Sequence, residues 1–333
     1  MVFVLFGVSL IVFYLARGFP RQGFDPVAPY INPKMTSEQI AEVRRIHGFD
    51  QPLYIQYVFW LQDVLRGDWG RTGIWAQGRS VLGVFSLSFP YTVQLSVAAT
   101  ILTVTIGLPL GIISAVKNNK LPDHVSRIIA LTGYSTPSYW FGFMLQLVFF
   151  YYFSVWGLPN LPNNLAVSPG IGTVPRVTGM PVLDGLLAGN LLYAWDAFCH
   201  LILPAFTLAF ISLGFLARIV RASMLEVMRQ DYITLARSKG LRERVVIYRH
   251  ALKNALIPAV TLTGLFFAGL LGGALITEFV FALPGVGQLS LQAVFQGDSN
   301  FILLYTLVLA AIIVVANLVV DVAYVFLDPR IKY

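Results

Sequence analysis

Six runs of apolar residues that contain no charged side chain divide this chain. The runs are residues 2–16, 92–116, 128–155, 201–217, 254–277 and 299–320. A helix that crosses lipid needs about 20 mainly apolar residues, because its backbone must satisfy its own hydrogen bonds across roughly 30 Å of hydrocarbon. The pattern therefore predicts an all-α membrane protein with six transmembrane helices.

The first run is the shortest, and a secretory signal peptide is its competing interpretation. The run has no basic residue ahead of it and no small-x-small cleavage site after it. We therefore expect residues 1–17 to form transmembrane helix 1.

Composition supports a membrane protein and excludes several other classes. Hydrophobic residues make up 57% of the 333 residues and charged residues only 12%, against about a quarter in a soluble domain. The single cysteine, Cys199, rules out an internal disulfide. The four histidines are far apart in sequence, without paired ligand spacing. We expect no metal site and no cofactor.

Basic residues give the orientation of the helices. Lys117, Lys120 and Arg127 lie between the second and third runs, and many more lie between the fourth and fifth. The loop between the third and fourth runs holds only Arg176. Because Lys and Arg are enriched in cytoplasmic loops, both termini are expected in the cytoplasm and the protein in the cytoplasmic (inner or plasma) membrane. The net charge of +7 then reflects topology and membrane lipid, not nucleic acid.

Two external segments follow from this topology. Residues 18–90 are predicted to form a cap, in which Thr36 and Gln39 have capping-box spacing, so a short amphipathic helix should begin near Ser37. An apolar patch at 54–65, which includes Trp60, is expected to lie along the membrane surface. Residues 157–196 are rich in Gly, Pro and Asn and should form an irregular loop.

The segment at residues 218–258, which we call the elbow, is strongly basic. It predicts two helices, at 225–239 and 241–254, joined by a sharp turn at Gly240. Apolar residues that recur at helical intervals should form one face of the second helix: Leu241, Val245, Tyr248, Leu252 and Ala255. Its nine basic residues are Arg218, Arg221, Arg229, Arg237, Lys239, Arg242, Arg244, Arg249 and Lys253, against the acidic Glu226, Asp231 and Glu243.

Anchoring to anionic lipid is the simpler explanation of this charge. Three or four cations would suffice for an anchor, whereas the elbow combines nine with an apolar stripe and a glycine turn. This combination favours docking against another protein.

The elbow resembles the EAA loop of ABC-type importer permeases, in the form of the dipeptide, oligopeptide and nickel branch. The strings that carry the resemblance there are DYITLARSKGLRER at 231–244 and RHALKNALIP at 249–258. Others are GDWGRT at 67–72, LTGYSTP at 131–137, LILP at 201–204, SMLEV at 223–227, ITEFV at 276–280, PGVG at 284–287 and DPRI at 328–331. The resemblance covers nearly the whole chain. Such permeases usually carry an arginine-rich stretch before the first helix, so the sequence leaves open whether translation starts upstream of Met1.

The resemblance implies that the elbow acts as a coupling helix on a cytoplasmic ATPase. The coupling residues carried over are Ala236, Arg237, Ser238, Lys239, Gly240, Leu241, Arg242, Glu243 and Arg244. Leu235, Ala236 and Leu241 would fill an apolar groove of the ATPase. The implied partners are a second homologous permease in a heterodimer, two cytoplasmic ATP-binding subunits and an external solute-binding protein. None of the six lysines follows a glycine, so the chain has no Gly-Lys-Ser/Thr phosphate loop, and we expect no enzymatic activity of its own.

Ionisable residues at membrane depth are the default candidates for a pathway or gate, which here are Glu278 and Asp321. Each also has a structural explanation, as a helix end beside the Pro284 turn or as a hydrated group near the interface. Pro109, Pro137 and Pro204 are expected to bend their helices.

The predicted organisation is transmembrane helix 1 at 1–17, the external cap at 18–90 and a core permease domain at 91–333. Dipeptides or short oligopeptides are the expected cargo, partly from the string VTGM at 177–180. Nickel complexes and oligosaccharides are alternatives within the same machinery. A secondary transporter or channel would need repeats or more buried charges, and an intramembrane protease would need a catalytic motif that the sequence lacks.

Overall fold

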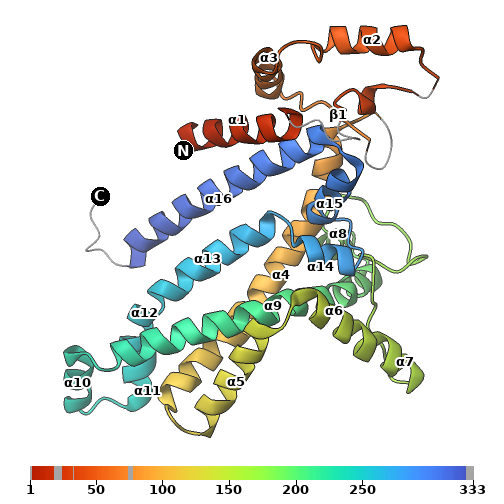
Figure 1. Ribbon diagram of the computed structural model, residues 1–333. Helices are drawn as coiled ribbons and strands as arrows, with labels where there is room; N and C mark the ends of the chain where they lie inside the picture. Colours follow the sequence, from red (N-terminus) through yellow and green to blue (C-terminus); the bar gives the residue numbers. More distant parts are fainter. Residues whose placement is uncertain (1, 19–24, 33, 74–77, 328–333) are drawn as a thin grey trace.

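Helices make up most of the computed structural model, which describes residues 2–18, 25–32, 34–73 and 78–327 (Figure 1). The first elements are α1 (Val2–Gly18), the 3₁₀ turn η1 (Ala28–Tyr30), α2 (Ser37–Ile46), α3 (Leu53–Leu65), β1 (Arg71–Thr72) and β2 (Arg79–Ser80). Next come α4 (Val81–Val116), α5 (Leu121–Ser135), α6 (Ser138–Gln146), the π-helical η2 (Leu147–Tyr152), α7 (Phe153–Val155) and α8 (Pro181–Leu187).

The second half begins with α9 (Leu191–Val227) and then the short elements of the elbow. These are α10 (Asp231–Ser238), α11 (Glu243–Val245), the π-helical η3 (Val246–Ala251) and α12 (Leu252–Ala255). The chain continues through α13 (Ile257–Leu271), α14 (Leu275–Val280), α15 (Val286–Gln296) and α16 (Ser299–Leu327).

Among the described residues, four helical stretches are long and apolar enough to cross a membrane. They are Val81–Val116, Ser138–Val155, Leu191–Val227 and Ser299–Val319. A fifth arises if Glu243–Ala255 and Ile257–Leu271, which meet at 52°, count as one span, and Phe3–Gly18 is a shorter apolar helix. All six predicted runs are helical over most of their length, while the number of crossings stays a prediction.

The centre of the molecule is the contact between α4 and α9, where small residues let the two backbones approach closely. A Cβ atom on Gly107 would lie 3.0 Å from the carbonyl oxygen of Leu213, and one on Gly111 would lie 2.6 Å from Cβ of Val220. Helix α5 packs on α9 in the same way, because Gly214 lies against the backbone of Ala130. Helices in lipid associate through such close packing of small residues.

The run at 128–155 is not one helix, which corrects the prediction. Helix α5 ends at Ser135, Thr136 is extended with ψ of 125°, and α6 begins after Pro137. The residue before a proline disfavours the helical conformation, so the break falls where the sequence places it. Helices α4 and α9 continue through Pro109 and Pro204, and after the break α6 and α7 turn away from α4 (Figure 1).

The cap, between α1 and α4, contains the helix predicted near Ser37, and the predicted apolar patch at 54–65 forms a second helix, α3. Thr36 and Gln39 form the reciprocal hydrogen bonds of a capping box at the start of α2, which confirms that prediction. Tyr57 and Trp60 of α3 are buried with Phe13 of α1 and Leu303 of α16. Residues 157–196 are less irregular than expected, because they include α8 and the first turns of α9.

Candidate functional site

The elbow folds back at Gly240, as predicted, but its helices have different bounds. Helix α9 ends at Val227, so the expected helix at 225–239 is interrupted before α10 begins at Asp231. Gly240 has φ of +74° and no other atom within 4 Å of an added Cβ. The turn therefore needs glycine for its backbone conformation and not for space.

The inner face of the elbow is part of the protein core. Ile233 and Ala236 of α10 pack with Val246 and Ile247 of η3, and the same cluster includes Met224 of α9. Ala236 is therefore buried in its own chain, which corrects the expectation that its side chain fills a groove in a partner. The two α10 residues lie three positions apart, on one helical face.

The expected apolar stripe of the second helix is only partly buried. Leu241 and Tyr248 are 39% and 59% exposed, while the buried positions in this region are Val246, Ile247, Ala251 and Ala255. The predicted and observed buried positions differ because residues Val246–Ala251 form a π-helix. Its wider turn changes which side chains lie on the buried face.

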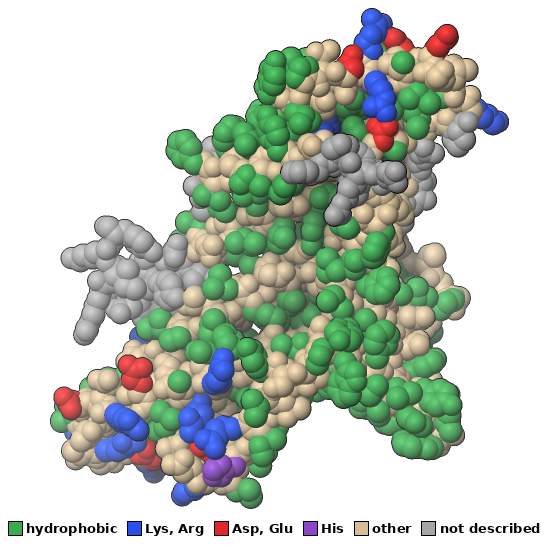
Figure 2. Space-filling model, in the orientation of Figure 1, with side chains coloured by type: hydrophobic (Ala, Val, Ile, Leu, Met, Phe, Trp, Pro, Cys, Tyr) green, Lys and Arg blue, Asp and Glu red, His purple; other side chains and the backbone are tan. Residues whose placement is uncertain are grey.

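The outer face of the elbow therefore combines exposed apolar and basic side chains. Leu235 is 56% exposed beside Leu241 and Tyr248. Lys239, Arg242 and Arg244 are also exposed, and among the described residues none of the three has a carboxylate at ion-pair distance. Figure 2 shows basic side chains gathered at this end of the molecule, below a largely apolar middle region.

Arg237 forms an ion pair with another residue of the elbow. Its guanidinium donates to both carboxylate oxygens of Glu243, at 2.8 Å from Nη2 and 3.3 Å from Nε. These hydrogen bonds hold the pKa of the Glu243 carboxyl below its ordinary value. The pair closes the turn around Gly240, so these two predicted coupling residues contact each other.

An ion pair with a fully buried carboxylate, which sequence reasoning missed, joins α5 to the start of the elbow on α9. Arg221 donates to Asp123 from Nε at 2.8 Å and from Nη2 at 2.9 Å. The Asp123 carboxylate also accepts from Ser114 Oγ and from the backbone N–H of Asn119. A signal was available, because Asp123 is the one acidic residue in the basic loop between the second and third apolar runs.

Glu278 is fully buried where α14, α15 and α4 meet. Its carboxylate accepts from Thr92 Oγ1 at 2.8 Å and from the backbone N–H of Gln288 at 3.0 Å. Gly285 lies so close that an added Cβ would be 2.3 Å from Glu278 Oε2. Glu278 lines neither of the two cavities described next. Asp321 lies in α16, and its side chain is outside the described part of the chain.

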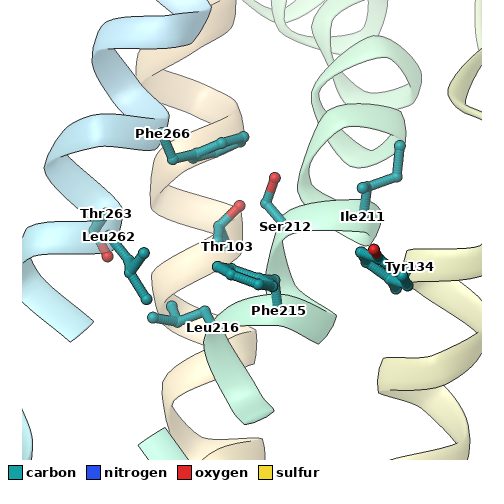
Figure 3. A pocket seen from close by; sticks show the side chains of 9 residues that line it. All are labelled: Thr103, Tyr134, Ile211, Ser212, Phe215, Leu216, Leu262, Thr263 and Phe266. Atoms are coloured by element: carbon teal, nitrogen blue, oxygen red, sulfur yellow. The ribbon is translucent and has the colours of Figure 1, made fainter. Parts of the chain in front are cut away.

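Two adjoining cavities lie among α4, α5, α9 and α13. The first has a volume of about 220 Å³, and Figure 3 shows residues of all four helices around it. It is lined by Thr103, Tyr134, Ile211, Ser212, Phe215, Leu216, Leu262, Thr263 and Phe266. The second, about 400 Å³, shares Tyr134 and Phe215 and adds three arginines, Arg127, Arg218 and Arg221.

The second cavity is lined in part by the elbow residues Arg218 and Arg221. Its lining residue on α4 is Ser114, while that of the first cavity is Thr103. Eleven positions of helix correspond to about 16 Å along the axis. Most of these lining residues lie inside ordinary apolar runs, so their place around a cavity could not be predicted from the sequence. Among the described residues, no group of three or more His, Cys, Asp or Glu side chains could hold a metal ion.

The region that contains the elbow, the second cavity and every lining residue of the first cavity except Thr103 matches a known protein family. A sequence profile described as "Binding-protein-dependent transport system inner membrane component" matches residues 107–333. The chain belongs to this family of inner membrane transport components. The matched region includes the Gly240 turn, the Arg221 and Asp123 pair and Glu278.

Curated relatives of this inner membrane component extend the similarity to the cap. The chain is 39% identical over 331 residues to a protein of Escherichia coli (strain K12) named "Probable D,D-dipeptide transport system permease protein", covering 99% of this chain and 94% of the relative. It is 37% identical to the dipeptide transport system permease protein of Alkalihalophilus pseudofirmus, covering 99% and 96%. It is 32% identical to the oligopeptide transport system permease protein of Bacillus subtilis (strain 168), covering 99% and 96%.

Proposed function

We propose that this chain is a permease subunit of an ATP-dependent importer that moves dipeptides or short oligopeptides across the cytoplasmic membrane by alternating access. The names of the relatives support the cargo class. Six crossings place both termini in the cytoplasm, the cap outside and the elbow inside, in agreement with the distribution of basic residues.

The observation that carries this proposal is the two-sided construction of the elbow. Its inner face is packed into the same hydrophobic cluster as α9 and α4, and its outer face leaves Leu235, Leu241 and Tyr248 exposed among cations. Exposed apolar side chains surrounded by charge are typical of a protein-docking surface. We assign the ATP-binding subunits to this surface.

The packing also provides a route by which movement of the elbow would be transmitted to the cavities. Val220 and Met224 of α9 share a core with Ile233 of α10, so α9 and the elbow should move together. Helix α13, whose Leu262, Thr263 and Phe266 line the first cavity, follows the elbow directly in the chain. Closure of two ATP-binding subunits would then move both elbows and reorient the pathway between this chain and a second, homologous permease.

Reconstitution tests this function. The chain, a second permease, two ATP-binding subunits and a solute-binding protein should import a labelled dipeptide into proteoliposomes only when ATP is present. Uptake by this chain alone, without ATP, would support a secondary transporter or channel instead. Competition by a nickel complex or an oligosaccharide, but not by peptides, would point to one of those cargoes.

A further inference from the structure

Arg218 stands where the two cavities meet, next to the aromatic side chains that they share. Its guanidinium carbon lies 5.0 Å from the centre of the Phe215 ring and 5.7 Å from that of Tyr134. Both rings line both cavities, and Arg218 lines the second. A guanidinium stays charged in proteins and is attracted to the faces of aromatic rings. The rings thus orient the cation without neutralising it.

Arg218 differs in this respect from the other two arginines of the second cavity. Arg221 is bound to the Asp123 carboxylate, and Arg127 Nη2 lies 3.2 Å from Nδ1 of His124. Among the described side chains, no carboxylate forms an ion pair with Arg218. The second cavity therefore has a net positive charge and one guanidinium whose donors remain available to an anion.

The first cavity is lined mainly by apolar side chains and has no charged lining residue. The hydroxyl of Thr103 donates to the carbonyl of Ala99, and that of Thr263 donates to the carbonyl of Ala259, each at 2.8 Å. Each hydroxyl proton is occupied, so the lone pairs of these two oxygens remain as acceptors toward the cavity. A cavity that offers acceptors and no cation suits a positively charged group.

We infer that the two cavities together bind a zwitterionic peptide with its terminal carboxylate on Arg218 and its ammonium group toward Thr103 and Thr263. This inference rests on the proposed function and specifies how the cargo lies during passage. The carboxylate and ammonium are the groups that all free dipeptides share, whatever their side chains. Recognition of these termini would leave the intervening apolar walls, such as Phe266 and Leu262, to accept varied side chains.

The test compares a dipeptide with its C-terminal amide in the fully reconstituted importer, with the same solute-binding protein throughout. The measured quantity is the ratio of free-acid to amide uptake, per ATP hydrolysed. Comparing this ratio between variants cancels any preference of the solute-binding protein. We expect Arg218→Gln to reduce the ratio about tenfold, as for loss of one charge-assisted hydrogen-bonded pair. Arg218→Lys should retain part of the preference for the free acid, because lysine keeps the positive charge.

Lys117→Gln is the matched control. Lys117 is an exposed basic residue at the C-terminal end of α4, three positions after the cavity residue Ser114, and it lines neither cavity. This substitution should leave the ratio unchanged. If Arg218→Gln does not assemble, Arg218→Lys decides: a ratio equal to that of the unaltered protein would overturn the inference.

Two other outcomes would also overturn it. One is an unchanged ratio in Arg218→Gln while import continues, which leaves the proposed function intact. The other is an equal loss for acid and amide that varies with the anionic lipid content of the vesicles, which would assign Arg218 to lipid phosphate. Failure of the unaltered importer to take up any peptide would instead refute the proposed function.

Discussion

Arg221 donates two hydrogen bonds to the carboxylate of Asp123, at 2.8 and 2.9 Å, although the two residues are 98 positions apart in the chain. The carboxylate is completely buried. Arg221 lies on α9 at the start of the elbow. Asp123 lies in the first turn of α5, and the other end of α5 carries Tyr134, which lines both cavities. The pair links α5 to α9, so we expect the helices that line the cavities to move together with the elbow.

Breaking this pair from one side should be costly. Arg221→Gln leaves a buried carboxylate without its cation, and such changes typically cost about 3 kcal/mol. We expect a lower thermal unfolding temperature of the purified chain in detergent. The double variant Asp123→Asn with Arg221→Gln should lose less than the sum of the two single variants. Strict additivity would show that the residues do not act as a pair.

The same pair predicts a pH dependence. Arg221 lowers the pKa of Asp123 in the folded protein, so its stabilisation is present above the ordinary carboxyl pKa of about 4 and is lost progressively below it. The difference in unfolding temperature between the unaltered protein and Asp123→Asn should be constant from pH 8 to pH 5 and should narrow below pH 4. A difference that already falls between pH 7 and pH 5 would contradict this assignment.

The ion pair between Arg237 and Glu243 predicts a charge-swap result. Both side chains are largely exposed, so the pair should contribute less than about 1 kcal/mol to stability. Its proposed effect is on the shape of the turn. Arg237→Glu should lower dipeptide uptake per ATP hydrolysed several-fold, and the swap of both residues should restore most of it. No restoration would mean that Arg237 contacts the partner instead.

The Gly240 turn can be tested with two substitutions of different backbone preference. Asparagine tolerates positive φ far better than a β-branched residue. Because the φ of Gly240 is +74° and its surroundings are open, Gly240→Asn should retain most transport and Gly240→Val should lose it. Both variants should reach the membrane in normal amounts by immunoblot. Equal transport by the two would show that the turn conformation is unimportant.

Glu278 is expected to hold α14 and α15 against α4. Gly285→Ala would place a methyl group 2.3 Å from the Glu278 carboxylate, so it should lower the thermal stability about as much as Glu278→Ala. Gly269→Ala is the control, because Gly269 has no positive φ and no atom lies within 4 Å of an added Cβ. If Glu278→Ala changes peptide selectivity without affecting stability, the residue belongs to the pathway instead.

The sequence was sufficient where a local rule decides the structure. The capping box of Thr36 and the turn at Gly240 each depend on residues close together in the chain. Proline alone was not sufficient, because Pro137 interrupts its helix whereas α4 and α9 continue through Pro109 and Pro204.

Other features depend on tertiary contacts that periodicity does not reveal. The burial of Ala236 and the exposure of Tyr248 follow from a π-helical segment, whose register shift no spacing rule detects. The Asp123 and Arg221 pair requires knowing that α5 packs on α9. The cavities arise where four apolar helices fail to fill the space among them, which their composition alone does not show.

The most direct test of the account is a crosslink from the outer face of the elbow to an ATP-binding subunit. Cys199 is the only cysteine, so a Cys199→Ser background allows a single new thiol at Leu241, with Ser86 on α4 as an exposed control position. In the assembled importer, a short thiol-to-amine crosslinker should join Leu241→Cys to an ATP-binding subunit and should leave Ser86→Cys uncoupled. Absence of that product in an importer that transports normally, or labelling of Leu241→Cys from outside the membrane, would contradict the account.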